Sequence, residues 1–407
     1  MEERTMSDEN ELWILGGART PMAEYSGTPG FGKLKSVSAI DLGAASLTAA
    51  LERTGVAPDQ VDHVIMGNAL QTSADALYGA RHVLLKAGVP IDRPALTVNR
   101  LCGSGIESII SGARMIRLGE ARMVAAGGME NMSQAPHVLR GARDGFRFGK
   151  GVELEDLLFS ALRDPICDLL MAQTAENLAR RYGISREAQD SFALRSHRMG
   201  AEAVKSGRFA EEIVPVEVKT RKGSLTVDTD DHIKPDTTLE ALSRLPPAFG
   251  KDGTVTAGNA SGIVDGAAAV LVAGAARARE LGLDAPLGKI IDWAVVGVDP
   301  AEMGIGPAPA IRKVCEQTGI PLAQIDLFEI NEAFSAQYLA VEQELRLNRD
   351  RVNVNGGAIA LGHPLGATGT RLVLTLLMSL KRTGGRYGLA SACIGGGQGV
   401  ALLVEAR

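Results

Sequence analysis

The sequence predicts an α/β protein with two domains. Short apolar strands alternate with amphipathic helices along most of the chain, which is the pattern of stacked sheet and helix layers. The 407 residues are too many for one ordinary compact core. Glycine is abundant, at 48 residues, whereas aromatic residues make up only 4%. This composition favours tight turns and close packing of helices on sheets.

The predicted elements lie mainly towards the two ends of the chain. In the first third, strands are expected at 12–15, 61–66, 95–98 and 123–126, with a helix at 40–51. In the last third, strands are expected at 290–296, 327–330, 352–354, 389–392 and 400–404. A helix between them is marked by Leu372, Val373, Leu376, Leu377 and Leu380.

The two ends of the chain also echo each other. In each, a strand leads through an asparagine, Asn99 or Asn355, into a glycine-containing turn and then a helix. A later strand then ends in glycines, at 127–128 in the first half and at 395–397 in the second. Internal duplication explains this echo, although echoes this loose also arise by chance in α/β proteins.

The segment 132–256 interrupts this rhythm, being richer in charge and in turn residues. Two helical patterns, 171–182 and 185–206, lie within it. We therefore expect a folded insertion carried by the first half, and the alternative is a partly disordered loop.

Composition excludes several classes of function. The net charge of −5 gives no reason to expect a nucleic-acid partner. No apolar run approaches the roughly 18–20 residues of a membrane span. The first ten residues are acidic and polar, unlike a secretion signal or a mitochondrial presequence, so we expect a cytoplasmic protein.

The four cysteines form no C-x-x-C pair, so a zinc knuckle or a thioredoxin-type motif has no support. Four cysteines are also too few for a disulfide framework in a chain of this length. Free thiols are expected, with Cys167 and Cys315 in structural roles. The other two, Cys102 and Cys393, stand beside glycines.

Cys102 precedes a helical pattern, which places its sulfur near a helix N-terminus, where the helix dipole favours the nucleophilic thiolate. Gly103 and Gly105 would leave room for an acyl chain. The alternative is a buried cysteine at a helix start, with the glycines needed for packing.

His363 lies between Gly362 and Pro364, in a loop that must bend sharply. A histidine there can take a proton near neutral pH and so activate a thiol. A satisfied structural histidine is the alternative.

Cys393 follows an apolar strand and precedes three glycines at 395–397. A thiol suits proton transfer to and from a carbon acid, because its reference pKa of about 8.5 is closer to neutrality than that of a carboxylate. The glycine N–H groups could stabilise an oxyanion. A plain turn, or a weak phosphate loop lacking the P-loop lysine, is the alternative.

Asn331 ends a predicted strand. Its amide could orient a water or contact a substrate carbonyl, and helix capping is the alternative.

Together, the stretches 99–105, 331–334, 356–369 and 393–399 resemble the thiolase family in both order and spacing. The resemblance runs from about Leu12 to the C-terminus and includes the stretch 255–262. It implies two similar βαβαβαββ halves stacked in five layers. The N-terminal half would be 1–131 with 257–283, the inserted loop domain 132–256, and the C-terminal half 284–407.

The resemblance also implies an acyl-CoA C-acyltransferase of fatty acid metabolism. Cys102 would attack a 3-ketoacyl-CoA and hold the acyl group as a thioester, after His363 takes its proton. Cys393 would exchange a proton with the acetyl-CoA enolate. Asn331 would hold a water that forms one oxyanion hole with His363, and the N–H groups of Cys102 and Gly395 would form the other. Acetyl-CoA C-acetyltransferase activity is favoured, with a broad or longer-chain 3-ketoacyl-CoA thiolase of degradation as the alternative.

Coenzyme A and acyl-CoA enter as substrates, and no metal or permanently bound cofactor is implied. The loop domain would carry coenzyme A contacts and oligomer contacts, and a homo-oligomer, either a dimer or a tetramer, is expected. The implied contacts are Met171, Lys234, Phe249, Ala257, Gly258, Ser261, Met303 and Phe334.

One departure from the family concerns Leu170, because many short-chain thiolases have histidine there. Leu170 removes a polar contact and adds apolar surface, a change of only about 1–3 kcal/mol in binding. Two rivals remain. A ketoacyl synthase would lack the Cys393-type cysteine, and a non-catalytic lipid-binding relative need not keep Cys102, Asn331, His363 and Cys393 together.

Overall fold

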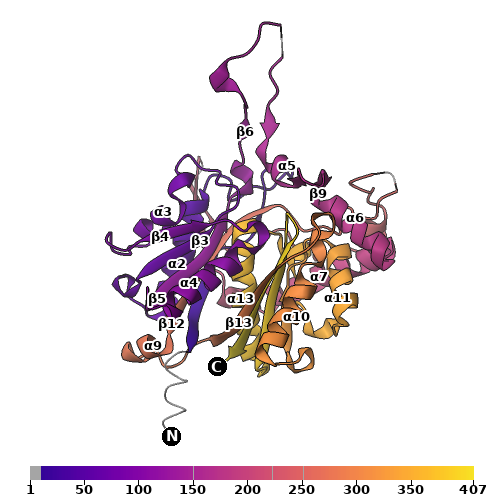
Figure 1. Cartoon of the computed structure of the whole chain (residues 1–407). Helices are drawn as coiled ribbons and strands as arrows, with labels where there is room; N and C mark the ends of the chain where they lie inside the picture. The colour runs from indigo at the N-terminus through magenta and orange to yellow at the C-terminus, as the bar shows by residue number, and fades with distance from the viewer. Residues whose placement is uncertain (1–10, 150, 222, 251) are drawn as a thin grey trace.

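The computed structural model describes residues 11–149, 151–221, 223–250 and 252–407. Two similar halves stand side by side, with the first in indigo and purple and the second in orange and yellow (Figure 1). One mixed sheet runs through both, in the order β14-β15-β16-β13-β1-β12-β5-β3-β4. The halves join where β1 (Leu12–Arg19) and β13 (Gly288–Gly297) pair over only three residues each.

The first half of the sheet contains β1, β3 (His63–Gly67), β4 (Ala95–Val98), β5 (Met123–Glu130) and β12 (Val264–Gly274). β3 runs parallel to β4 and to β5, and β12 runs antiparallel to both β5 and β1. β12 brings the chain back to the first half after the insertion. It was absent from the predicted strands, because its sequence is mostly alanine, glycine and valine without polar alternation.

The second half repeats this arrangement with β13, β14 (Leu327–Ile330), β15 (Tyr387–Ile394) and β16 (Gln398–Ala406). β14 is parallel to β15, and β16 is antiparallel to both β15 and β13. Strand order and direction therefore match between the halves for every strand except β4, which has no counterpart strand beside β14, and this match is what internal duplication produces.

The strand predicted at 352–354 was wrong. Only one parallel bridge forms there, between Phe328 and Val352. Asn353 adopts a left-handed φ of 48°. Its side chain accepts from the Ile330 N–H at 2.9 Å and donates to the Ile330 carbonyl at 2.9 Å. The side chain thus takes the place of a backbone ladder at this sheet edge.

Helices complete five layers. α4 (Ser104–Arg117) and α13 (Leu365–Thr383) pack together between the two halves of the sheet, in a core with residues of both. They approach closely at glycines, since a Cβ atom at Gly105 would lie 2.4 Å from the Thr370 nitrogen.

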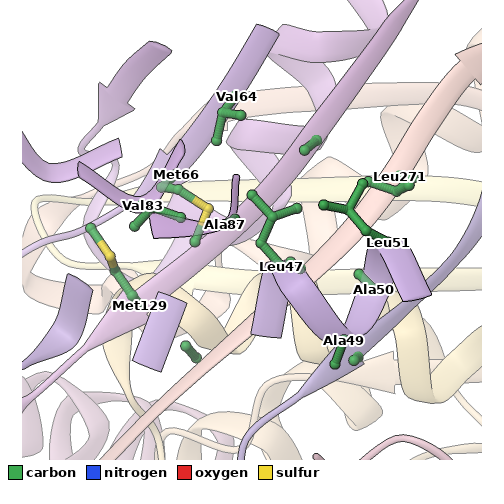
Figure 2. Packing of buried hydrophobic residues seen from close by; sticks show 14 of the residues in the cluster. Leu47, Ala49, Ala50, Leu51, Val64, Met66, Val83, Ala87, Met129 and Leu271 are labelled. Carbon is green, nitrogen blue, oxygen red and sulfur yellow. The ribbon is translucent and has the colours of Figure 1, made fainter. Parts of the chain in front are cut away.

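The outer helices cover the remaining faces. α2 (Ala39–Thr54) and α3 (Gly79–Lys86) cover the first half, and α10 (Pro307–Thr318) and α11 (Ser335–Leu345) cover the second. Figure 2 shows Leu47 and Leu51 of α2 beside Met66 and Leu271 of the sheet.

The insertion contains regular structure and touches both halves. The helices predicted at 171–182 and 185–206 are α6 (Met171–Tyr182) and α7 (Arg186–Lys205), which pack into the core of the second half. The hairpin of β10 (Val216–Thr220) and β11 (Gly223–Val227) packs against the core of the first half. The short helix α8 (Leu239–Ser243) follows.

An arm extends from the insertion (Figure 1). It rises through β6 (His137–Val138) and returns through β7 (Glu155–Asp156) and α5 (Leu157–Ala161). A small ladder of β8 (Arg163–Asp164) and β9 (Leu169–Leu170) then leads into α6. No helix in the described part of the chain is long and apolar enough to cross a bilayer.

Candidate active site

Cys102 lies in a short 3₁₀ helix, Leu101–Gly103, that runs directly into α4. Leu101 before it has a left-handed φ of 45°, an uncommon conformation for leucine. Its N–H donates to Asn99 Oδ1 at 2.9 Å, which holds this conformation in place. The sulfur therefore sits at a helix start, as predicted, on a backbone constrained just ahead of it.

The glycines after Cys102 serve packing. A Cβ atom at Gly103 would lie 2.6 Å from Ile394, and one at Gly105 would clash with α13. The expectation that they leave room for an acyl chain is corrected accordingly. They allow the Cys102 loop to seat directly against the second half, beside Cys393.

The two thiols are neighbours with different surroundings. Burial raises the pKa of the Cys102 thiol to about 11, and N–H groups of Gly395 and of Cys102 itself, directed at the sulfur, offset part of that rise. Cys393 is the last residue but one of β15 and is fully buried, and burial and the nearby Cys102 raise its pKa further above the ordinary range. Desolvation thus raises the pKa of both thiols and favours the protonated form of each, opposite to the lowering expected from a helix N-terminus.

His363 is buried in the loop before α13, and its N–H donates to the Gly262 carbonyl at 2.9 Å. Its ring Nδ1 lies 2.6 Å from Thr368 Oγ1, and that hydroxyl donates to the Pro364 carbonyl. Because the hydroxyl hydrogen is already used, Nδ1 carries the ring proton and Nε2 keeps its lone pair. Burial and the charge of Arg371 lower the pKa of His363 to about 3.

Asn331 follows the end of β14 and is fully buried. Its Nδ2 lies 3.3 Å from His363 Nε2, which it donates to. Phe334 occupies the N-cap position of α11, so the capping alternative for Asn331 is wrong. Asn331 Oδ1 has no hydrogen-bond partner among the described residues. A buried acceptor of this kind is suited to a water or to a substrate donor.

A cavity of about 290 Å³ opens beside His363, and its wall is almost wholly apolar. His363 is part of its wall, and Leu365, another wall residue, packs with Cys102. Four of the predicted contacts line it: Met171, Phe249, Ser261 and Phe334. Leu170 lines it too, where the sequence departs from many short-chain thiolases.

Sequence reasoning missed other wall residues, including Phe159 and Leu162 at the base of the arm, and Met132 and Ile263. They are single apolar side chains in loops or short elements, and no local signal separates them from core residues.

The remaining predicted contacts lie outside this wall. Met303 packs with Cys393, Met171 and Phe334 in a small apolar cluster. Ala257 is exposed, and Gly258 packs beneath Leu245. Lys234 pairs with Glu24 at 3.7 Å and lies over the Phe31 ring. Their coenzyme A contacts stay predictions.

Two family models together match nearly the whole chain. The thiolase N-terminal domain matches residues 12–276 and the thiolase C-terminal domain matches residues 284–406. The chain belongs to the thiolase family. The resemblance, the fold and the acyltransferase class predicted from the sequence are thereby confirmed, and this thiolase is an acyl-CoA acyltransferase.

Relatives of this thiolase carry two names. The human mitochondrial 3-ketoacyl-CoA thiolase is 49% identical over 394 residues, covering 97% of this chain and 98% of the relative. An acetyl-CoA acetyltransferase of Cupriavidus necator is 49% identical over 398 residues, covering 98% and 100%. A crystal structure of the human thiolase in complex with CoA superimposes with a TM-score of 0.94 at 48% identity, covering 98% of this chain and 99% of that one.

Proposed function

We propose that this thiolase reversibly cleaves 3-ketoacyl-CoA with coenzyme A through a thioester on Cys102. The observation that carries the proposal is the convergence of two thiols, an imidazole whose Nε2 keeps its lone pair and two backbone N–H groups, next to an apolar cavity that His363 lines. The protonated resting state requires a base, because only the thiolate is a strong nucleophile. His363 Nε2 is the group available to take the Cys102 proton.

The first half-reaction breaks a carbon–carbon bond. Cys102 Sγ attacks the ketone carbon, and the N–H groups of Cys102 and Gly395, already directed at the sulfur, stabilise the oxyanion. As the adduct collapses, the bond between C2 and C3 breaks and its electron pair enters the acetyl-CoA enolate. Cys393 gives its S–H proton to that carbon, and acetyl-CoA leaves.

The enolate oxygen needs its own donors. Protonated His363 Nε2 can supply one, and a water donating to Asn331 Oδ1 can supply the other with its second hydrogen. In the second half-reaction, the coenzyme A thiol gives its proton to the Cys393 thiolate and its sulfur attacks the Cys102 thioester. The bond between Cys102 Sγ and the acyl carbon breaks, Cys102 takes back the proton held on His363, and acyl-CoA leaves. Condensation of two acetyl-CoA molecules follows the same steps in reverse.

The cavity favours a substrate range wider than acetoacetyl-CoA. Its wall combines Leu170 with Phe159 and Leu162, so apolar groups surround the site where an acyl chain would extend. We therefore propose a broad 3-ketoacyl-CoA thiolase that includes acetyl-CoA C-acetyltransferase activity. Both activities occur among the names of its relatives.

The test is CoA-dependent thiolysis by purified protein over 3-ketoacyl-CoA substrates of increasing chain length. A kcat/KM that holds or rises beyond acetoacetyl-CoA supports the broad range, and a sharp maximum at acetoacetyl-CoA assigns a dedicated acetyltransferase. Mass spectrometry after exposure to acetyl-CoA should show an acetyl group on Cys102. Its absence would leave a binding-only relative as the explanation.

We also propose a homo-oligomer in the cytoplasm. β4 is an edge strand, and an edge presents unpaired backbone groups to another chain. Exposed apolar side chains gather on and near it: Leu77, Tyr78, Ile91 and Leu96. The arm offers a second exposed apolar surface, with Phe146 and Phe148, which supports a tetramer. The predicted compartment depended on residues 1–10, which lie outside the described part of the chain.

A further inference from the structure

Glu130, the last residue of β5, is a fully buried carboxylate with no role in the chemistry above. Four donors surround it. Asn68 Nδ2 and the Leu70 N–H reach Oε1 at 2.8 and 3.0 Å, and the N–H groups of Ala69 and Gly366 reach Oε2 at 3.0 and 2.9 Å. Among the described residues, none forms a salt bridge with it. A buried charge without a cation is costly, so its presence needs a reason.

One set of these bonds leads to the nucleophile. Glu130 holds the Ala69 N–H, and the Ala69 carbonyl accepts from Asn99 Nδ2 at 3.2 Å. Asn99 Oδ1 in turn accepts from the N–H of Leu101, the left-handed residue directly before Cys102. Glu130 is therefore linked, through Ala69 and the Asn99 side chain, to the loop that positions the Cys102 sulfur.

The other bond leads to the base. Gly366 lies three residues after His363, in the first turn of α13, which also supplies Thr368 to His363 Nδ1. Gly366 is packed tightly against the first half, because a Cβ atom there would lie 2.6 Å from the Gly67 carbonyl oxygen and 2.7 Å from the Met129 carbonyl oxygen. Glu130 thus holds a loop of each half with one carboxylate.

We propose that Glu130 is a positioning residue for the thiolase reaction, which holds the Cys102 loop of the first half in register with the His363 loop of the second. This inference rests on the roles proposed above for Cys102 and His363. A carboxylate suits the task because both oxygens accept, whereas an amide would turn an NH₂ group toward two of the four donors.

The charge of Glu130 works against the chemistry, which argues that its value is geometric. Its negative charge raises the pKa of Cys102 and so disfavours the thiolate. Its own pKa is raised to about 7 by burial and, in smaller part, by Asp265, in spite of the donors. The other ionisable groups of this network are Cys393 of β15, which faces Cys102, Asp265 of β12, which faces Glu130, and Arg371 of α13, which faces His363.

The experiment compares Glu130→Gln with Asp62→Asn in the full-length protein. Asp62 is the matched control, because its carboxylate also accepts from backbone N–H groups, those of Arg122 and Met123 at 2.8 and 3.0 Å, but at the opposite end of β5 from Glu130. Quenched-flow mass spectrometry gives the rate of Cys102 acetylation by acetyl-CoA, steady-state thiolysis gives kcat and KM, and a thermal melt gives stability.

For Glu130→Gln, we expect acetylation and kcat to fall about 10²-fold, the effect of a reacting group misplaced by roughly 1 Å, with KM for CoA within about twofold. Alkylation of Cys102 by iodoacetamide should meanwhile shift to lower pH, because the neighbouring anion is gone. A residue that only stabilised the fold would lower the melting temperature and leave these rates unchanged. Asp62→Asn should keep the native rates.

A second variant keeps the test decisive if Glu130→Gln does not fold. Asn99 is exposed, and Asn99→Ala removes its side chain from the same series of hydrogen bonds. The rate of Cys102 acetylation should therefore fall by about tenfold, which corresponds to the free energy of one hydrogen bond. Native acetylation rates in folded Glu130→Gln, or in Asn99→Ala if the first variant is unfolded, would overturn the inference. Failure of the native protein to acetylate Cys102 would instead overturn the proposed function.

Discussion

At the residue scale, the two active-site thiols differ in what they can do without help. Cys102 is partly exposed and receives two N–H groups, whereas Cys393 is fully buried near the end of β15, where it packs with Met303 and faces Cys102. The first can be approached by a substrate carbonyl. The second can only pass a proton to an atom brought next to it. This division separates the steps that each side chain supports.

Cys393→Ala tests that division. The variant should still become acetylated on Cys102, because the base and the oxyanion donors are intact. It should lose carbon–carbon cleavage and condensation by about 10²–10⁴-fold, the usual contribution of a positioned acid or base. Mass spectrometry follows the first step and thiolysis kinetics the second, with Cys102→Ala as the control that loses both. Equal loss of the two steps in Cys393→Ala would contradict the assignment.

The pH dependence of Cys102 alkylation follows from its raised pKa. The folded-state pKa of about 11 lies above the ordinary value, so the thiolate fraction grows as pH rises towards 11. Inactivation of the free enzyme by iodoacetamide should therefore accelerate by about tenfold per pH unit from pH 7 to 10. A small-molecule thiol with a pKa of about 8.5 should level off near pH 9 in the same assay. A plateau of the enzyme near pH 7 would show instead a resting thiolate–imidazolium pair.

At the element scale, the central helices carry the site because they touch at glycines. α4 begins just after Cys102, α13 begins just after His363, and the two contact each other through Gly105 and Gly369. A Cβ atom at Gly369 would lie 2.4 Å from the Ile106 nitrogen, against backbone that cannot move aside. The close contact between α4 and α13 therefore sets the distance between the Cys102 loop and the His363 loop.

Gly369→Ala should destabilise the protein by about 1–3 kcal/mol, the range of overpacking, and should also lower kcat because the two loops are pushed apart. Gly274→Ala is the matched control, since its Cβ would make an ordinary contact at 3.4 Å with Ile116. Urea unfolding and thiolysis kinetics measure both effects. A stability of Gly369→Ala equal to that of the control would show that the helices can separate without cost.

The same scale shows why sequence reasoning succeeded and failed where it did. Strands and helices with clear periodicity, such as α6 and β14, lie where the pattern put them. The strand expected at 352–354 failed because the Asn353 side chain, rather than backbone, bonds to Ile330. β12 was not predicted, because a strand buried on both faces shows no alternation of apolar and polar residues.

The active site divides in the same way. Cys102, His363, Asn331 and Cys393 were found because reactive side chains among glycines form an unusual local pattern. Glu130 was missed because an acidic residue normally indicates a solvated position, and only the fold shows it buried. Phe159 reaches the cavity through the return of the arm, a long-range contact that no local pattern encodes.

At the scale of the whole molecule, the sheet edge formed by β4 has no strand paired with it on its outer side within the described chain. β4 exposes its outer backbone, and Leu96 in it is 46% exposed, with Ile91 at 78% just before the strand. Edge strands of monomers are usually short, charged or covered. An apolar edge of this kind suits pairing with a second copy of the chain, which would bury these side chains together.

Leu96→Lys should therefore reduce the molar mass in solution, because a charge at the strand centre would have to be buried without a partner on association. Light scattering after size exclusion gives the mass, and Leu225→Lys is the control, since Leu225 is similarly exposed at 40% but lies on the β10–β11 hairpin. The control should keep the native mass. If Leu96→Lys also keeps it, the oligomer is held elsewhere, and the exposed apolar residues of the arm become the next surface to substitute.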